Sequence, residues 1–111
     1  MRRVILESPY AGDVEGNLAY ARLCVRDCLL RGEAPIASHL LYTQPGILDD
    51  LIPEERRLGI NAGLAWGPVA EATVVYTGRG ISKGMWQGIE GAWSENRPIH
   101  VRTLPHCGGA P

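Results

Sequence analysis

Residues 4–13, VILESPYAGD, contain the transition that decides the fold. The apolar run Val4-Ile5-Leu6 is typical of a short buried strand, and Glu7-Ser8-Pro9 is typical of the turn that ends it. Asp13 is a favoured residue at a helix N-cap, and Gly32 is a favoured residue just past a helix end. Between them apolar residues recur at helical spacing, at Leu18, Ala21, Cys24, Val25, Cys28 and Leu29. The segment therefore predicts a strand that leads into an amphipathic helix.

The rest of the chain repeats this alternation of strand and helix. Three further strands are predicted, at residues 35–38, 72–76 and 97–103. Two further helices are predicted, at 53–66 and 82–95, and a long irregular loop is expected at 39–52. Strands that alternate with helices form parallel sheets with right-handed crossovers. We therefore expect an α/β fold, a small doubly wound parallel sheet of about four strands of the Rossmann-like or flavodoxin-like type.

Length and composition indicate one globular domain, which we place at residues 1–104, followed by a frayed tail at 105–111. Eleven basic and twelve acidic residues leave a net charge of -1, which argues against a nucleic acid polymer or an anionic membrane as partner. No apolar run reaches the roughly 20 residues that span a bilayer, so a cytoplasmic protein is expected. Cys24 and Cys28 fall within the apolar helical pattern and are expected in the core. No metal site and no cofactor are predicted.

The candidate site residues follow the predicted strands. Ligands of doubly wound sheets bind beyond the carboxyl ends of the strands, where the winding direction reverses. The loop after the first strand offers two hydroxyl groups, a glycine and a carboxylate before a helix, a set that suits an anion or a sugar; the alternative is a simple capping turn. These residues are Ser8, Tyr10, Gly12 and Asp13.

The loops after the second and third strands add further candidates. Ser82-Lys83-Gly84 opens the last helix, where a hydroxyl group, backbone N–H groups and a lysine can hold one phosphate; the alternative is a serine N-cap beside an exposed lysine. His39 follows the second strand, where it can act on a ligand or serve as a hydrogen-bonded structural residue. The last helix also contains Gly84, Gly88 and Gly91, each costing up to about 1 kcal/mol relative to alanine, which indicates close packing or a nearby ligand.

Four segments, 6–13, 38–42, 53–60 and 80–85, resemble the nucleoside 2-deoxyribosyltransferase-like superfamily, and are most similar to an uncharacterised branch from phages and bacteria. The resemblance implies a ligand that contains a base and a ribose or deoxyribose, with or without a 5′-phosphate. It places Ser8 and Ser82 where the family binds sugar or phosphate. A phage-encoded member would act in the host cytoplasm.

The resemblance is interrupted at the catalytic carboxylate. The family's enzymes carry a nucleophile in the pattern Ser-x-Gly-x-x-x-Glu, and counting from Ser82 places Gly88 at the glutamate. Glu90 comes two residues later, about 200° further around a helix, and Thr73 replaces an acidic residue of the third strand.

Two functions therefore stay open at this point. One is a nucleoside- or nucleotide-binding protein that sequesters or senses its ligand, which the glycine at position 88 favours. The other is an N-glycosidase or deoxyribosyltransferase that acts on a nucleoside or its 5′-monophosphate, with Glu90 or Asp13 as the catalytic carboxylate. A third interpretation is an accessory domain that functions through its oligomer interface, to which Trp86 and Trp93 would contribute if exposed. A homo-oligomer, a dimer or higher, is expected in each case.

Overall fold

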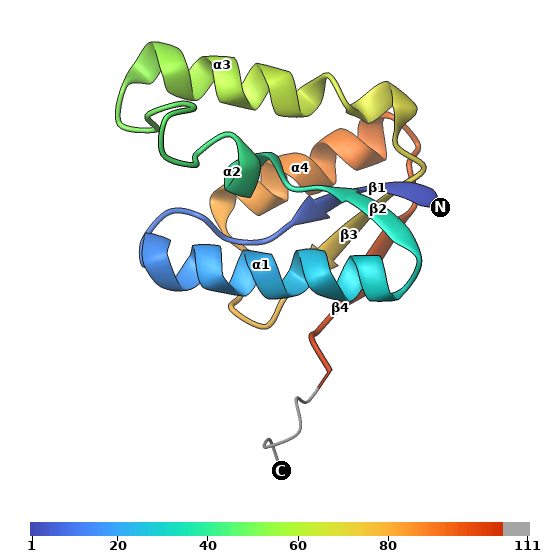
Figure 1. Cartoon of the computed structure of the whole chain (residues 1–111). Coiled ribbons are helices and arrows are strands. Elements are labelled where there is room, and N and C mark those ends of the chain that lie inside the picture. The colour runs from blue at the N-terminus through green and yellow to red at the C-terminus, as the bar shows by residue number, and fades with distance from the viewer. Residues whose placement is uncertain (106–111) are drawn as a thin grey trace.

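The computed structural model describes residues 1–105 and shows one parallel four-stranded sheet with the strand order β2-β1-β3-β4 (Figure 1). The strands are β1 (Arg2–Glu7), β2 (Glu33–Ile36), β3 (Ala72–Tyr76) and β4 (Ile99–Arg102). The helices are α1 (Val14–Leu30), α2 (Ser38–Leu41), α3 (Pro53–Leu64) and α4 (Lys83–Ser94), and a 3-10 turn, η1, covers Gly67–Val69. The predicted α/β fold class is confirmed.

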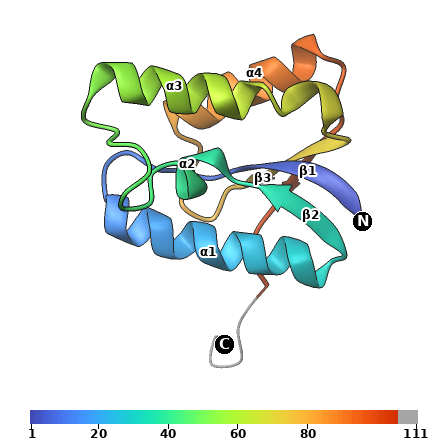
Figure 2. The same cartoon turned by 45° about the horizontal axis from the view of Figure 1, so that its top comes forward.

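The helices lie on both faces of the sheet. Figures 1 and 2 show α1 on one face, and α3 and α4 on the other. The chain leaves β1 for β2 on one side and later adds β3 on the other side of β1. The winding direction therefore reverses between β1 and β3, which is where sheets of this kind bind ligands.

Alternating residues of the strands form two cores. Val4 and Leu6 pack against Cys24 and Cys28 of α1 in the larger core, where all four side chains are almost completely buried. On the opposite face, Val75 of β3 packs with Met85 and Ile89 of α4, which recur at helical spacing. This confirms the expected burial of Cys24 and Cys28.

The second strand and the loop that follows it differ from the prediction. β2 begins at Glu33 and ends at Ile36, earlier than the expected range of 35–38. The loop expected at 39–52 starts with the short helix α2, whose backbone N–H groups at Leu40 and Leu41 bond to the Ala37 carbonyl. No side chain caps this helix, so the sequence carries no start signal for it. The predicted tail at 105–111 lies outside the described residues, except for Pro105.

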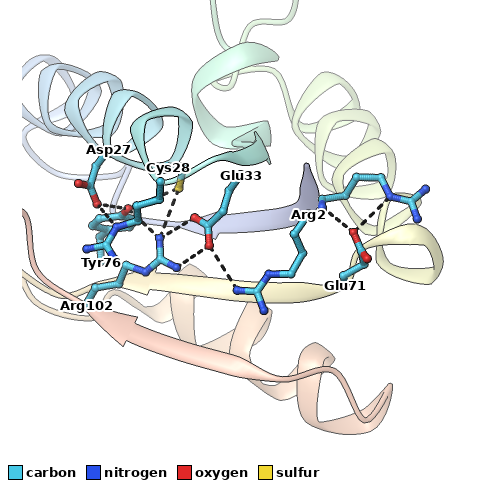
Figure 3. Close-up of polar contacts among 9 residues, drawn as sticks. Arg2, Asp27, Cys28, Glu33, Glu71, Tyr76 and Arg102 are labelled. Atoms are coloured by element: carbon cyan, nitrogen blue, oxygen red, sulfur yellow. Dashed lines mark hydrogen bonds and ion pairs between the residues drawn. The ribbon is translucent and has the colours of Figure 1, made fainter.

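A polar network lies on the face of the sheet that α1 covers, next to the end of α1 (Figure 3). Arg102, at the end of β4, binds both carboxylate oxygens of Glu33 at 2.7 Å. The Tyr76 hydroxyl donates to Asp27 at 2.6 Å and accepts from Arg102 at 3.2 Å. The hydrogen bonds from Arg102 hold the pKa of Glu33 at about 2, and the same arginine stacks on the Tyr76 ring. The charged groups of this network are paired with one another, which identifies it as structural support for the sheet.

Candidate functional site

Two adjoining hollows lie at the carboxyl end of the sheet. The larger has a volume of about 880 Å³ and lies between residues 10–14 and residues 43–51, with Arg56 at its border. The smaller has a volume of about 470 Å³ and lies between the start of α1 and residues 79–82. Ala11 lines both, so the loop after β1 is their common wall. Loops from three strands thus enclose space at the predicted edge.

The residues predicted in the first loop divide between the two hollows. Tyr10 and Gly12 line the larger, whereas Asp13 lines the smaller together with Ser82. Gly12 has a φ angle of +99°, a conformation that other residues rarely adopt. The loop is fixed from below by Asn17, whose side-chain amide donates to the backbone carbonyls of Tyr10 and Ala11. The sequence did not indicate this role of Asn17.

Asp13 and Ser82 are both helix caps, as predicted. Asp13 accepts a hydrogen bond from the Gly16 N–H at 3.2 Å, and Ser82 accepts one from the Met85 N–H at 3.2 Å. Asp13 also forms an ion pair with Arg79 at 3.1 Å, while its side chain stays 67% exposed. Arg79 thereby brings a guanidinium group to the smaller hollow, beside the Ser82 hydroxyl. Lys83 and Gly84 follow on the exposed first turn of α4.

Ser8 and His39 come together from the ends of two neighbouring strands. The Ser8 hydroxyl oxygen and the His39 Nε2 atom share a hydrogen bond at 2.6 Å. Burial lowers the pKa of His39 from 6.5 to about 4, so the imidazole is neutral at pH 7. The Ser8 side chain is only 4% exposed. The hydrogen bond between Ser8 and His39 connects the first loop to α2. The neutral His39 imidazole can take up a proton only in acid.

Glu7 is a further carboxylate at this edge of the sheet, although it lines neither hollow. It ends β1, and its carboxyl group lies directly against the backbone of α4 at Gly88, where a β-carbon would collide with both carboxylate oxygens. Burial raises the pKa of Glu7 from 4.5 to about 8, and the charge of Arg97 only partly opposes this shift. Within residues 1–105 no group donates a hydrogen bond to the Glu7 carboxyl group. Gly88 was the available signal, because a glycine inside a helix indicates close approach of another group.

The three faces of α4 have different surroundings. Met85, Ile89 and Ala92 face the sheet and are buried. Gly88 is one position before this stripe and borders Glu7, while a β-carbon at Gly91 would meet nothing within 4 Å. Glu90 shares the outer face with Trp86 and Trp93, which are 46% and 60% exposed. A carboxyl group therefore lies beside position 88, and it comes from Glu7 of β1 and not from a residue of α4.

Residues 1–105 contain no group of three or more histidine, cysteine or acidic side chains placed to hold a metal ion. In the same part of the chain, no helix combines the length and the apolar character needed to cross a bilayer.

The comparisons with known proteins agree with this architecture. Among solved structures, a 2-deoxyribosyltransferase from Bacillus psychrosaccharolyticus matches with a TM-score of 0.63 over 95% of this chain and 76% of its own, at 16% sequence identity. This similarity shows a common fold. A search of the curated proteins finds no match. Residues 2–102 match the sequence model of a domain of unknown function, DUF7768, so that nearly the whole described chain is covered. The chain therefore belongs to the DUF7768 family.

Proposed function

We propose that this protein binds a nucleoside or nucleotide in the two adjoining hollows at the carboxyl end of the sheet. The observation that carries the proposal is the position of these hollows, which are built by the loops after β1, β2 and β3 beside the point where the winding reverses. The larger volume, about 880 Å³, falls within the range of small-molecule sites.

The lining of the hollows fits the parts of such a ligand. The Tyr10 ring and the side chains of Ile47 and Leu48 offer apolar and aromatic surface for a base. The smaller hollow offers the Arg79 guanidinium and the Ser82 hydroxyl, which suit sugar hydroxyls or a 5′-phosphate. The Ser8–His39 pair anchors the loop that separates the two. Lys83 and Gly84 extend the polar edge at the start of α4.

The fold supports the nucleoside class of ligand. The similar solved structure is that of a 2-deoxyribosyltransferase, an enzyme that its describers recommend for the synthesis of nucleosides. A protein that uses the same edge of the same fold to bind, sequester or sense a nucleoside needs no catalytic carboxylate. A nucleoside N-glycosidase or deoxyribosyltransferase is the second candidate, and the Glu7 carboxyl group beside Gly88 is the observation that favours it.

We also propose that the protein is a homo-oligomer. No residue of α3 is buried, although the helix carries Leu58 and Leu64, which are 58% and 62% exposed. Trp86 and Trp93 are exposed on the outer face of α4, as an interface would require. A second copy that covers these two helices, which lie on the same face of the sheet, would remove this apolar surface from water (Figure 2). Sedimentation at micromolar concentration should show a species larger than the 12.1 kDa monomer.

A thermal-shift panel tests the proposed binding. Nucleosides, nucleoside 5′-monophosphates, free bases and inorganic phosphate are each added to the purified protein, and ligands that bind the folded state raise its melting temperature. Ala11→Trp fills the wall shared by both hollows, and the matched control Ala19→Trp places the same ring on the exposed surface of α1. We expect stabilisation by nucleosides or nucleotides that Ala11→Trp abolishes and Ala19→Trp preserves. A panel without any stabilising nucleoside or nucleotide would contradict the proposal.

A further inference from the structure

We infer that the smaller hollow binds the 2′,3′-diol of a ribose, so that this site prefers a ribonucleoside or ribonucleotide to its 2′-deoxy counterpart. The inference rests on the proposed nucleoside or nucleotide ligand and adds to it which sugar the site selects. It follows from the charge balance of the hollow, from the hydrogen-bonding groups that the fold leaves unused there, and from the contacts that hold these groups in place.

The lining of the smaller hollow has no surplus of positive charge. Among residues 1–105, Asp13 and Arg79 are the only charged residues that line it, and they form an ion pair at 3.1 Å. A phosphate dianion only accepts hydrogen bonds, and here it would meet the Asp13 carboxylate without a second cation to offset the repulsion. An uncharged group that both donates and accepts hydrogen bonds fits this lining.

Asp13 and Arg79 have hydrogen-bonding capacity that the fold does not use. Arg79 donates from Nε to Asn17 at 2.8 Å and from Nη2 to Asp13 at 3.1 Å, and within residues 1–105 its Nη1 group has no acceptor. The Oδ1 atom of Asp13 accepts from the Gly16 N–H and Oδ2 accepts from Arg79, so each oxygen can accept one more hydrogen bond. The Asp13 side chain is 67% exposed and that of Arg79 is 38% exposed, which leaves both open to a ligand.

A vicinal diol matches these unused groups. Each hydroxyl group has one proton to donate and lone pairs that accept. Two adjacent hydroxyl groups can therefore donate to the Asp13 carboxylate and accept from the Arg79 guanidinium, and the charges of the protein groups strengthen these bonds. Dinucleotide-binding sheets also bind a ribose hydroxyl through a carboxylate. A 2′-deoxyribose lacks one of the two hydroxyl groups and would leave part of this capacity unpaired.

The fold holds Arg79 in place before a ligand binds. The Gly78 N–H donates to the Tyr20 hydroxyl at 2.9 Å, and the Gly80 N–H donates to the Thr77 carbonyl at 2.9 Å, which closes a tight turn around Arg79. Gly80 has a φ angle of +84°, which favours glycine at this position of the turn. Because the turn is already ordered, a ligand does not have to pay for ordering it.

The first turn of α1 leaves space for the ion pair. At Gly16 a β-carbon would collide with the Asp13 carboxylate and would lie 3.1 Å from the Nη2 atom of Arg79. A glycine inside a helix is less stable than alanine, and an exposed ion pair adds little to the stability of a fold. Stability therefore does not explain why Gly16 makes room for this pair, whereas recognition of a ligand does.

Isothermal titration calorimetry compares ligands that differ in one hydroxyl group. The common ribonucleosides, their 2′-deoxy counterparts, the 5′-monophosphates of both and D-ribose are titrated into wild type, Asp13→Ser and Arg79→Met. Serine can still cap α1 but removes the carboxylate, and methionine keeps an extended side chain without the donors of arginine. Glu15→Ser and Arg26→Met are the matched controls, since both residues are exposed on α1 and line neither hollow.

We expect each ribonucleoside that binds wild type to bind at least about 10-fold more tightly than its 2′-deoxy counterpart, because the latter loses hydrogen bonds to charged groups. This ratio should fall toward one in Asp13→Ser and in Arg79→Met, and both controls should keep the wild-type ratio. Equal or tighter binding of the 2′-deoxy compounds to wild type, or a ratio that either variant keeps, would overturn the inference and leave the proposed binding intact. Binding of no nucleoside or nucleotide, or binding of D-ribose as tightly as of any nucleoside, would refute both.

Discussion

Replacing Glu7 by glutamine should change how the stability of the protein depends on pH. In the folded protein burial holds the pKa of Glu7 at about 8, compared with 4.5 for the free side chain. Below pH 4.5 the group is protonated in both states and imposes no cost. As pH rises, the unfolded chain releases this proton first, which stabilises the unfolded state. The free energy of unfolding therefore decreases until the folded group also ionises near pH 8.

The expected magnitude follows from this pKa difference. Each pH unit between the two pKa values changes the free energy of unfolding by about 1.4 kcal/mol, which gives about 3 kcal/mol at pH 7 and about 5 kcal/mol above pH 8. Glutamine does not titrate, so Glu7→Gln should become progressively more stable than wild type over this range. Burying the amide adds a constant offset, and the slope against pH is therefore the quantity to compare.

Urea denaturation from pH 4 to pH 9 measures this slope in wild type and in the variants. Glu71→Gln is a control of opposite sign, because the hydrogen bond from the Arg3 N–H lowers the pKa of Glu71. That variant should be less stable than wild type at neutral pH and should lose this deficit in acid. If the difference between Glu7→Gln and wild type stays constant from pH 5 to pH 8, burial does not raise the pKa of Glu7, and this reasoning is wrong.

Three further substitutions test other parts of the structure by denaturation. Gly88→Ala should destabilise the protein because its methyl group displaces the Glu7 carboxyl group, whereas Gly91→Ala, which meets nothing within 4 Å, should stabilise it by up to about 1 kcal/mol; equal effects would contradict the contact. Arg102→Met leaves Glu33 with the more exposed Arg2 as its ion-pair partner and should cost up to about 3 to 5 kcal/mol at pH 7, and a cost below 1 kcal/mol would show that the network contributes little. Because burial lowers the pKa of His39 to about 4, wild type should lose stability as pH falls from about 6.5 to 4, and His39→Gln should remove this loss. If His39→Gln loses as much stability in acid as wild type does, other groups cause the loss.

The strands and helix starts could be predicted because their signals are local. β3 was predicted at 72–76 and occupies Ala72–Tyr76, where five consecutive apolar or β-branched residues are all buried. Asp13 and Ser82 were predicted as caps and are caps, since a capping side chain bonds only to the next turn. α2 was missed because it has four residues and no capping side chain.

The site could be predicted in part. The edge of the sheet followed from the order of strands and helices, and four of the predicted residues line the hollows there, namely Tyr10, Gly12, Asp13 and Ser82. The pairing of Ser8 with His39 joins positions 31 residues apart and was not predicted. The contact between Glu7 and Gly88 is equally non-local. The glycines inside α4 indicated that another group lies close to the helix, but the sequence did not show which group. The burial that raises the pKa of Glu7 depends on the packing of α4 over β1.

Mapping amide chemical shifts tests the proposed binding site most directly. Nucleoside 5′-monophosphates are titrated into the isotopically labelled protein, with inorganic phosphate as a parallel titration. The proposal predicts saturable shifts that cluster in residues 9–13, 43–51 and 78–84, with the nucleotide affecting more of these amides than phosphate does. Shifts that cluster instead around Arg2, Glu33 and Glu71 at the opposite edge, or an unchanged spectrum with every nucleotide, would contradict it.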